Sequence, residues 1–184
     1  MGFSLVLMTP GKAAFTGDYA LNRFLLTNTN ADGSVTTPDG GLSIVFAGGN
    51  NGSGLAGTTD FVTSATGAGT VRFQYSYSAL DFPGFDFGGY LLGGAFTQLA
   101  DTDGQSGVGQ FTVAAGRSFG FRVGTKDNTG EPGILTISNF TAPSGTGAPV
   151  PEPGTAPVLL LAAGGAVAAH RRLRRIQRGD EGTA

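Results

Sequence analysis

Aspartates are the side chains of this sequence best placed to bind a ligand. Asp101 and Asp103 stand two residues apart and precede Gly104, an order that resembles the start of a calcium loop. The sixth-position glycine and the closing glutamate of an EF-hand are missing, so the pattern is not an EF-hand. We therefore name Asp101 and Asp103 as candidate ligands of one structural calcium, and expect no other cofactor. Other carboxylates available to such an ion are Asp81, Asp86 and Asp127. The alternative is that all of them are solvated turn residues.

The sequence offers little to an enzyme. Its single histidine, His170, lies in a basic C-terminal segment, which excludes a Ser-His-Asp triad or a histidine metal site before that segment. Cysteine is absent, so thiol catalysis and disulfides are excluded as well. A glycosidase needs two facing carboxylates, and Glu131 sits beside Pro132 in a predicted turn. We expect a protein that is not an enzyme, with a polysaccharide hydrolase as the least favoured alternative.

Aromatic residues gather in the stretch ALDFPGFDFGGY. Aromatic ring faces can stack on saccharide rings, so this stretch is a candidate sugar-binding platform. The alternative is a loop whose rings fold back over the core. The candidate stacking residues are Phe82, Phe85 and Tyr90, with Phe87 between them.

Three segments follow one another near the C-terminus. The first is the sequence Val150, Pro151, Glu152, Pro153, Gly154, whose prolines hold the backbone extended. No residue from 156 to 169 is charged, which predicts a membrane helix at 155–169. Fourteen residues span about 21 Å, less than the roughly 30 Å bilayer core, although arginine stems can reach to the interface. A basic tail at 170–184 then holds a stop signal of Arg171, Arg172, Arg174 and Arg175. The alternative is an amphipathic helix on a soluble domain.

This tail resembles the PEP-CTERM sorting signal of Gram-negative bacteria that make extracellular polysaccharide. The resemblance implies exosortase, a membrane cysteine protease, as the partner that recognises residues 150–154. It further implies that the protein sits transiently in the inner membrane and then reaches the cell surface or the extracellular matrix of a biofilm. The segments FDFGGYLLGG and LTISNFTAP also look like the cargo domain common among such proteins.

Charge is divided along the chain. Residues 1–149 carry six Lys and Arg against ten Asp and Glu, whereas residues 150–184 carry five Arg against three acids. An acidic domain argues against nucleic-acid binding, which needs a basic face. The basic tail is better explained by orientation of the C-terminal segment in a membrane than by nucleic-acid binding.

The N-terminal residues 1–10 are apolar but short, and no Lys or Arg precedes them. Lys12 beside Ala13 spoils a cleavage motif, so we interpret 1–10 as a truncated signal segment whose true start lies upstream. The alternative is export without an ordinary signal peptide.

Residues 11–143 are expected to form one extracellular domain. Val71, Phe73, Tyr75 and Tyr77 alternate with polar residues, which predicts a strand with one buried face. Further strands are expected at 23–29, 42–48, 58–64, 90–99 and 133–140, with a hairpin of 111–113 and 119–123, and with loops at 31–41 and 79–89. About eight strands indicate an all-β, antiparallel, jelly-roll-like sandwich, followed by a Pro/Gly linker at 144–154.

Together these observations predict an exported surface or matrix protein without enzymatic activity. Exosortase, the inner membrane before processing and exopolysaccharide are its expected partners. A carbohydrate-binding module of the polysaccharide matrix is the alternative.

Overall fold

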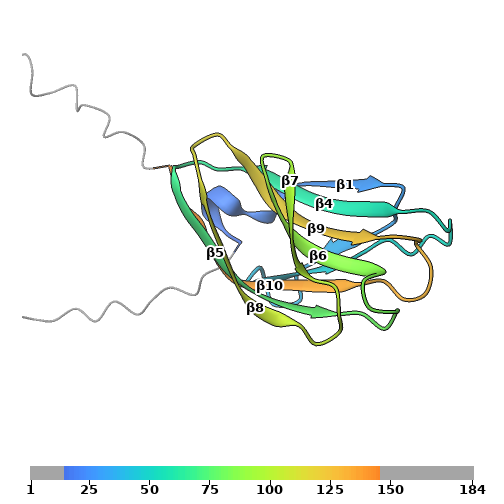
Figure 1. Ribbon diagram of the computed structural model, residues 1–184. Helices are drawn as coiled ribbons and strands as arrows, with labels where there is room; N and C mark the ends of the chain where they lie inside the picture. Colours follow the sequence, from blue (N-terminus) through green and yellow to red (C-terminus); the bar gives the residue numbers. More distant parts are fainter. Residues whose placement is uncertain (1–14, 146–184) are drawn as a thin grey trace, which may run out of the picture. The chain divides into compact units, whose positions relative to one another are not determined.

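The computed structural model describes residues 15–145, which form a sandwich of two five-stranded antiparallel sheets (Figure 1). The antiparallel two-sheet sandwich expected from the sequence is confirmed, with ten strands instead of about eight. The signal segment at 1–10, the sorting residues 150–154, the expected helix at 155–169 and the arginine tail all lie outside the described residues.

Helical structure in this part of the chain is confined to two short 3-10 turns, Gly17–Tyr19 (η1) and Leu21–Arg23 (η2). Among the described residues no helix has the length and apolar character needed to cross a bilayer. The strands are β1 (Leu25–Thr29), β2 (Ser34–Thr36), β3 (Ser43–Ala47), β4 (Gly57–Ser64), β5 (Gly69–Ser78), β6 (Asp86–Leu92), β7 (Ala95–Ala100), β8 (Ser106–Val113), β9 (Ser118–Thr125) and β10 (Ile134–Thr141).

The first sheet has the strand order β1-β4-β9-β6-β7 and the second sheet the order β2-β3-β10-β5-β8. Apart from β1 and β2, the orders β4-β9-β6-β7 and β3-β10-β5-β8 correspond to the interlocked Greek keys of a jelly roll. Most central strand neighbours are therefore distant in sequence, and the two sheets are tied together by connections that cross between them.

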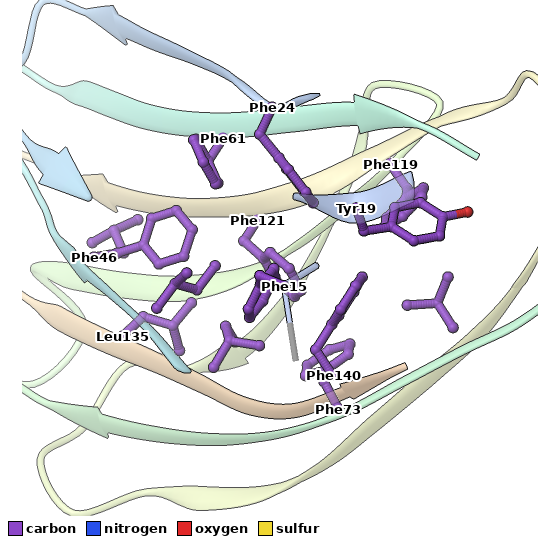
Figure 2. Packing of buried hydrophobic residues seen from close by; sticks show 14 of the residues in the cluster. Phe15, Tyr19, Phe24, Phe46, Phe61, Phe73, Phe119, Phe121, Leu135 and Phe140 are labelled. Carbon is purple, nitrogen blue, oxygen red and sulfur yellow. The ribbon is translucent and has the colours of Figure 1, made fainter. Parts of the chain in front are cut away.

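Alternation of side chains explains the core. On β5 the inward residues Val71, Phe73 and Tyr77 are buried and Tyr75 is half-buried, while the residues between them face water. This confirms the predicted facing of the strand. Inward phenylalanines of the two sheets meet edge to face, as with Phe73 and Phe121, whose ring centroids are 5.0 Å apart. Figure 2 shows the labelled rings lying between the two layers.

A β-bulge on β10 changes which side chains face the core. Leu135 and Ile137 point into the core, yet Phe140, three residues after Ile137, is also buried. The pairing of β10 with β5 shifts between Ser138 and Thr141, and Asn139 takes a φ of 49°. The extra residue returns Phe140 to the inner face, where it stacks on Phe15 at 4.5 Å.

Two strand predictions were wrong in their boundaries. The predicted loop at 31–41 contains the short strand β2, whose three residues carry too weak a pattern to be recognised. The single strand predicted at 90–99 is a hairpin of β6 and β7 around Gly93 and Gly94, both of which have positive φ. β6 also begins at Asp86, inside the predicted loop at 79–89.

The predicted hairpin of 111–113 with 119–123 was also wrong. β8 pairs with β5 in the second sheet, whereas β9 pairs with β4 and β6 in the first. The turn at 114–117 therefore crosses between sheets. Both strands direct phenylalanines into the same core, which made them look like partners in the sequence.

The end of the described chain is fastened to the sandwich. The Tyr19 hydroxyl donates to the carbonyl of Pro143 at 2.6 Å and accepts from the amide of Thr66 at 3.0 Å. The amide of Gly145 donates to the Thr66 hydroxyl at 3.0 Å. These bonds hold the chain against the 65–67 turn up to residue 145.

Replacing Phe73 tests the core. Phe73 is fully buried, so Phe73→Ala should lower the free energy of unfolding by about 3–5 kcal/mol, because it removes contacts and leaves a cavity. Ser76, on the outer face of the same strand, is the matched control, and Ser76→Ala should cost under about 0.5 kcal/mol. Equal losses in urea unfolding would contradict the assigned facing of β5.

Candidate functional site

The structure separates the aromatic residues proposed as a sugar platform. Phe82 and Phe85 lie in the loop before β6 and are 77% and 38% exposed. Tyr90 lies on the inner face of β6, stacked on Phe111 with ring centroids 4.6 Å apart. Because Tyr90 packs against the core, it does not share a surface with Phe82 and Phe85.

The outer face of the first sheet carries a different aromatic group. Phe87 on β6 and Phe96 on β7 point away from the core, are half-buried, and approach each other at 5.6 Å between ring centroids. On β9, Arg122 stands opposite Asp60 of β4 and opposite Gly89 of β6. We call Phe87, Phe96, Arg122 and Asp60 the aromatic face.

Glycines make room for the two rings. A Cβ atom on Gly124 would clash with the tip of the Phe87 ring, and one on Gly89 would clash with the carbonyl oxygen of Thr97 and lie 2.8 Å from the Phe96 ring. Each ring therefore lies over a glycine of the neighbouring strand. A side chain at either glycine would disturb this arrangement, in which the two ring planes are tilted by 58°.

Arg122 is held rigidly on this face. Its Nε and Nη2 atoms donate to the two carboxylate oxygens of Asp60, each at 2.6 Å. Hydrogen bonding to Asp60 raises the pKa of Arg122 above its usual value. The guanidinium carbon lies 5.6 Å from the centroid of the Phe96 ring, within reach of a cation–π interaction. Two-point pairing of this kind fixes orientation as well as charge.

A groove of about 410 Å³ adjoins Phe87 at the end of the sheet where β4 begins. Its volume is within the usual range of ligand pockets, roughly 300–1,000 Å³. The lining is mostly apolar and consists of Thr29, Ala56, Gly57, Thr58, Phe87, Thr125 and Lys126. The Lys126 ammonium group lies 5.9 Å from the centroid of Phe85, at the edge of the same region.

The proposed calcium ligands lie in the turn between β7 and β8. Asp101 accepts hydrogen bonds from the side chains of Gln98 and Thr102, each at 3.1 Å, and Asp103 accepts from the amide of Ala79 at 3.2 Å. Within residues 15–145, no three acidic, histidine or cysteine side chains are grouped so that they could hold a metal ion. Calcium binding by Asp101 and Asp103 stays a prediction.

Asp86 is a buried carboxylate that the sequence did not distinguish from the other aspartates. Only 2% of it is exposed, and its Oδ2 atom has no hydrogen-bond partner among the described residues. The hydroxyl of Tyr77 is likewise buried without a partner, and a Cβ on Gly133 would touch both Tyr77 and Asp86. The burial of Asp86 was not predicted from the sequence, because the glycines of β6 weaken the strand pattern and the residue falls in the predicted loop at 79–89.

Burial raises the pKa of the Asp86 carboxyl, and the Asp81 and Asp127 carboxylates raise it further. A hydrogen bond with Thr125 opposes the shift. The native state therefore binds a proton at Asp86 more tightly than the unfolded chain, whose aspartates have a pKa of about 3.9. The stabilisation that comes from this bound proton is fully present below the pKa of the unfolded state and is lost as the pH rises through the native pKa.

Asp86→Asn should consequently raise the melting temperature at pH 7.5, because it removes a buried charge while keeping the shape of the side chain. The gain should shrink as the pH falls, because the raised pKa lets the native carboxyl take up a proton and lose its charge. Asp103→Asn, at an exposed position, is the control for the loss of one carboxylate. A gain that does not change with pH, measured in thermal unfolding, would contradict the assigned cause.

Comparison with solved structures finds weak similarities. The secreted serine protease VesC from Vibrio cholerae is 10% identical with a TM-score of 0.41, over 61% of this chain and 24% of that chain. A CBM35 domain from Paenibacillus barcinonensis is 16% identical with a TM-score of 0.37, over 67% and 96% of the two chains. TmCBM61, in complex with beta-1,4-galactotriose, is 11% identical with a TM-score of 0.40, over 71% and 94%. No curated protein sequence matches the chain.

The C-terminal segment has a specific family match. Residues 149–175 match the PEP-CTERM protein-sorting motif. The matched range contains residues 150–154, the uncharged run and all four arginines of the predicted stop signal. The chain therefore carries a PEP-CTERM protein-sorting motif C-terminal to its β-sandwich in the sequence.

Proposed function

We propose that this protein is exported, held briefly in the inner membrane of a Gram-negative bacterium by its C-terminal segment, and released to the cell surface or the extracellular matrix after exosortase acts at residues 150–154. The observation that carries the proposal is the match of residues 149–175 to the sorting motif. The β-sandwich is the cargo, and it acts without catalysis.

Charge sets the orientation of the segment. Moving an arginine to the bilayer centre costs about 2.5–3.5 kcal/mol even on insertion scales, and four arginines follow the uncharged run. They remain on the cytoplasmic side, which leaves Pro151, Glu152 and Pro153 on the outer side of the inner membrane. The uncharged run is short for a bilayer, which favours a temporary anchor over a permanent one.

The segment between the described sandwich and the sorting residues is short in sequence. Five residues, 146–150, separate Gly145 from Pro151, so the chain between them extends at most about 20 Å. Because Tyr19 and Thr66 fasten the chain as far as Gly145, the folded sandwich does not lend extra length to the linker.

Carbohydrate binding is a second candidate function, in which the cargo holds the polysaccharide matrix. The observation that favours it is the aromatic face, where two partly exposed phenylalanine rings lie on the outer side of the first sheet. This function is independent of sorting, because it uses residues of the sandwich alone.

Replacing Pro151, Glu152 and Pro153 with alanine should leave membrane insertion intact and block processing. The full-length form should then accumulate in the inner-membrane fraction, detected by immunoblotting with an antibody against the sandwich. Replacing the four arginines with serine is the matched change at the other end, and it should impair retention and orientation while leaving the motif intact.

A protein that reaches the cell surface in normal amount and at processed size, despite the three alanines, would rule out recognition of this motif. Both sets of changes lie outside the described residues 15–145, and thermal unfolding of each variant should show that the sandwich is folded.

A further inference from the structure

We propose that the aromatic face of the first sheet binds a neutral polysaccharide, with Phe87 and Phe96 as the stacking rings and the adjoining groove as the place for one sugar unit. The inference deepens the second candidate function by naming the site and the class of ligand. It replaces the platform of Phe82, Phe85 and Tyr90 expected from the sequence.

Stacking is the first requirement, and the face meets it. Phe87 and Phe96 project outward from neighbouring strands of one sheet, and both side chains are partly exposed. Gly124 and Gly89 let the rings lie over the backbone, so each ring is supported from below. Aromatic rings fixed in this way offer apolar surface to the C–H face of a sugar at little entropic cost.

Oriented polar groups are the second requirement. The Arg122–Asp60 pair lies beside the rings, and its two-point contact fixes both side chains in one geometry. Arg122 keeps further N–H donors besides the two that Asp60 accepts. Gln98 occupies the same outer row on β7, so hydroxyl-binding groups flank the rings on both sides.

The groove extends the face from Phe87 toward the start of β4. Its mostly apolar lining and its threonine hydroxyls at Thr29 and Thr58 suit a sugar ring, which presents both apolar and hydroxyl surface. Phe87 belongs to both the groove and the aromatic face, which makes the two a continuous surface.

Charge selects a neutral ligand. The residues 15–145 contain five Lys and Arg against ten Asp and Glu, so the domain repels polyanions. Asp60 neutralises Arg122 on the face itself. Lys126 is the one cationic side chain among the residues that line the groove, so an acidic polysaccharide would find little charge compensation there.

Affinity electrophoresis of the full-length chain in detergent tests the inference. The probes are a neutral β-glucan, a galactan and a mannan, with polygalacturonate as the acidic counterpart. At least one neutral polysaccharide should retard the protein, and Phe87→Ala and Phe96→Ala should each weaken that binding about tenfold. Phe82→Ala, which removes a more exposed ring from the preceding loop, is the matched control and should bind normally.

Unchanged thermal unfolding of the variants should show that they fold. Retardation by none of the neutral probes would overturn the inference, as would binding of polygalacturonate alone. Loss of binding in Phe82→Ala but not in Phe87→Ala and Phe96→Ala would move the site to the loop. If the same variants instead abolished self-association, the face would be a contact between copies of the chain. None of these results alters the sorting proposal, which is read from processing of the tail.

Discussion

Edge-to-face packing of phenylalanines between the two sheets is the interaction on which the sandwich depends. The chain has no cysteine, so no disulfide supplements the core. Phe73, Phe121 and Phe140 are almost completely buried and link the second sheet to the first. Because side chains alternate along a strand, the same packing decides which residues face outward. The outward position of Phe87 follows from the inward positions of its neighbours on β6.

Local alternation was predictable from the sequence, but strand pairing was not. Four alternating residues of β5 were enough to give its buried face. Pairing depends on contacts between distant residues, so β8 and β9 looked like a hairpin although they belong to different sheets. The aromatic face was missed for the same reason, since Phe87 and Phe96 meet only after β6 and β7 pair. Phe87 is one of the four aromatic residues in the stretch 82–90. Tyr90 was expected on the sugar platform but faces the core, because the sequence did not show which face of the strand it occupies.

The sorting motif and the aromatic face are recognised from different kinds of information. The sorting motif is an ordered run of residues that can be read directly from the sequence, and the family match covers 149–175. The aromatic face has no such linear signature, because its members come from β4, β6, β7 and β9. Exposure, glycine support and the Arg122–Asp60 pair become visible only in three dimensions. The tail thus supports the sorting proposal, and the outer face of the first sheet supports the separate proposal of carbohydrate binding.

The mass of the C-terminal peptide, measured in protein recovered from the surface of intact cells, tests whether the tail is removed during sorting. We expect a chain that ends near Pro153 and lacks Arg171 and every residue after it. A surface-exposed protein whose C-terminal peptide still ends at Ala184 would contradict the proposal that the tail is removed during sorting.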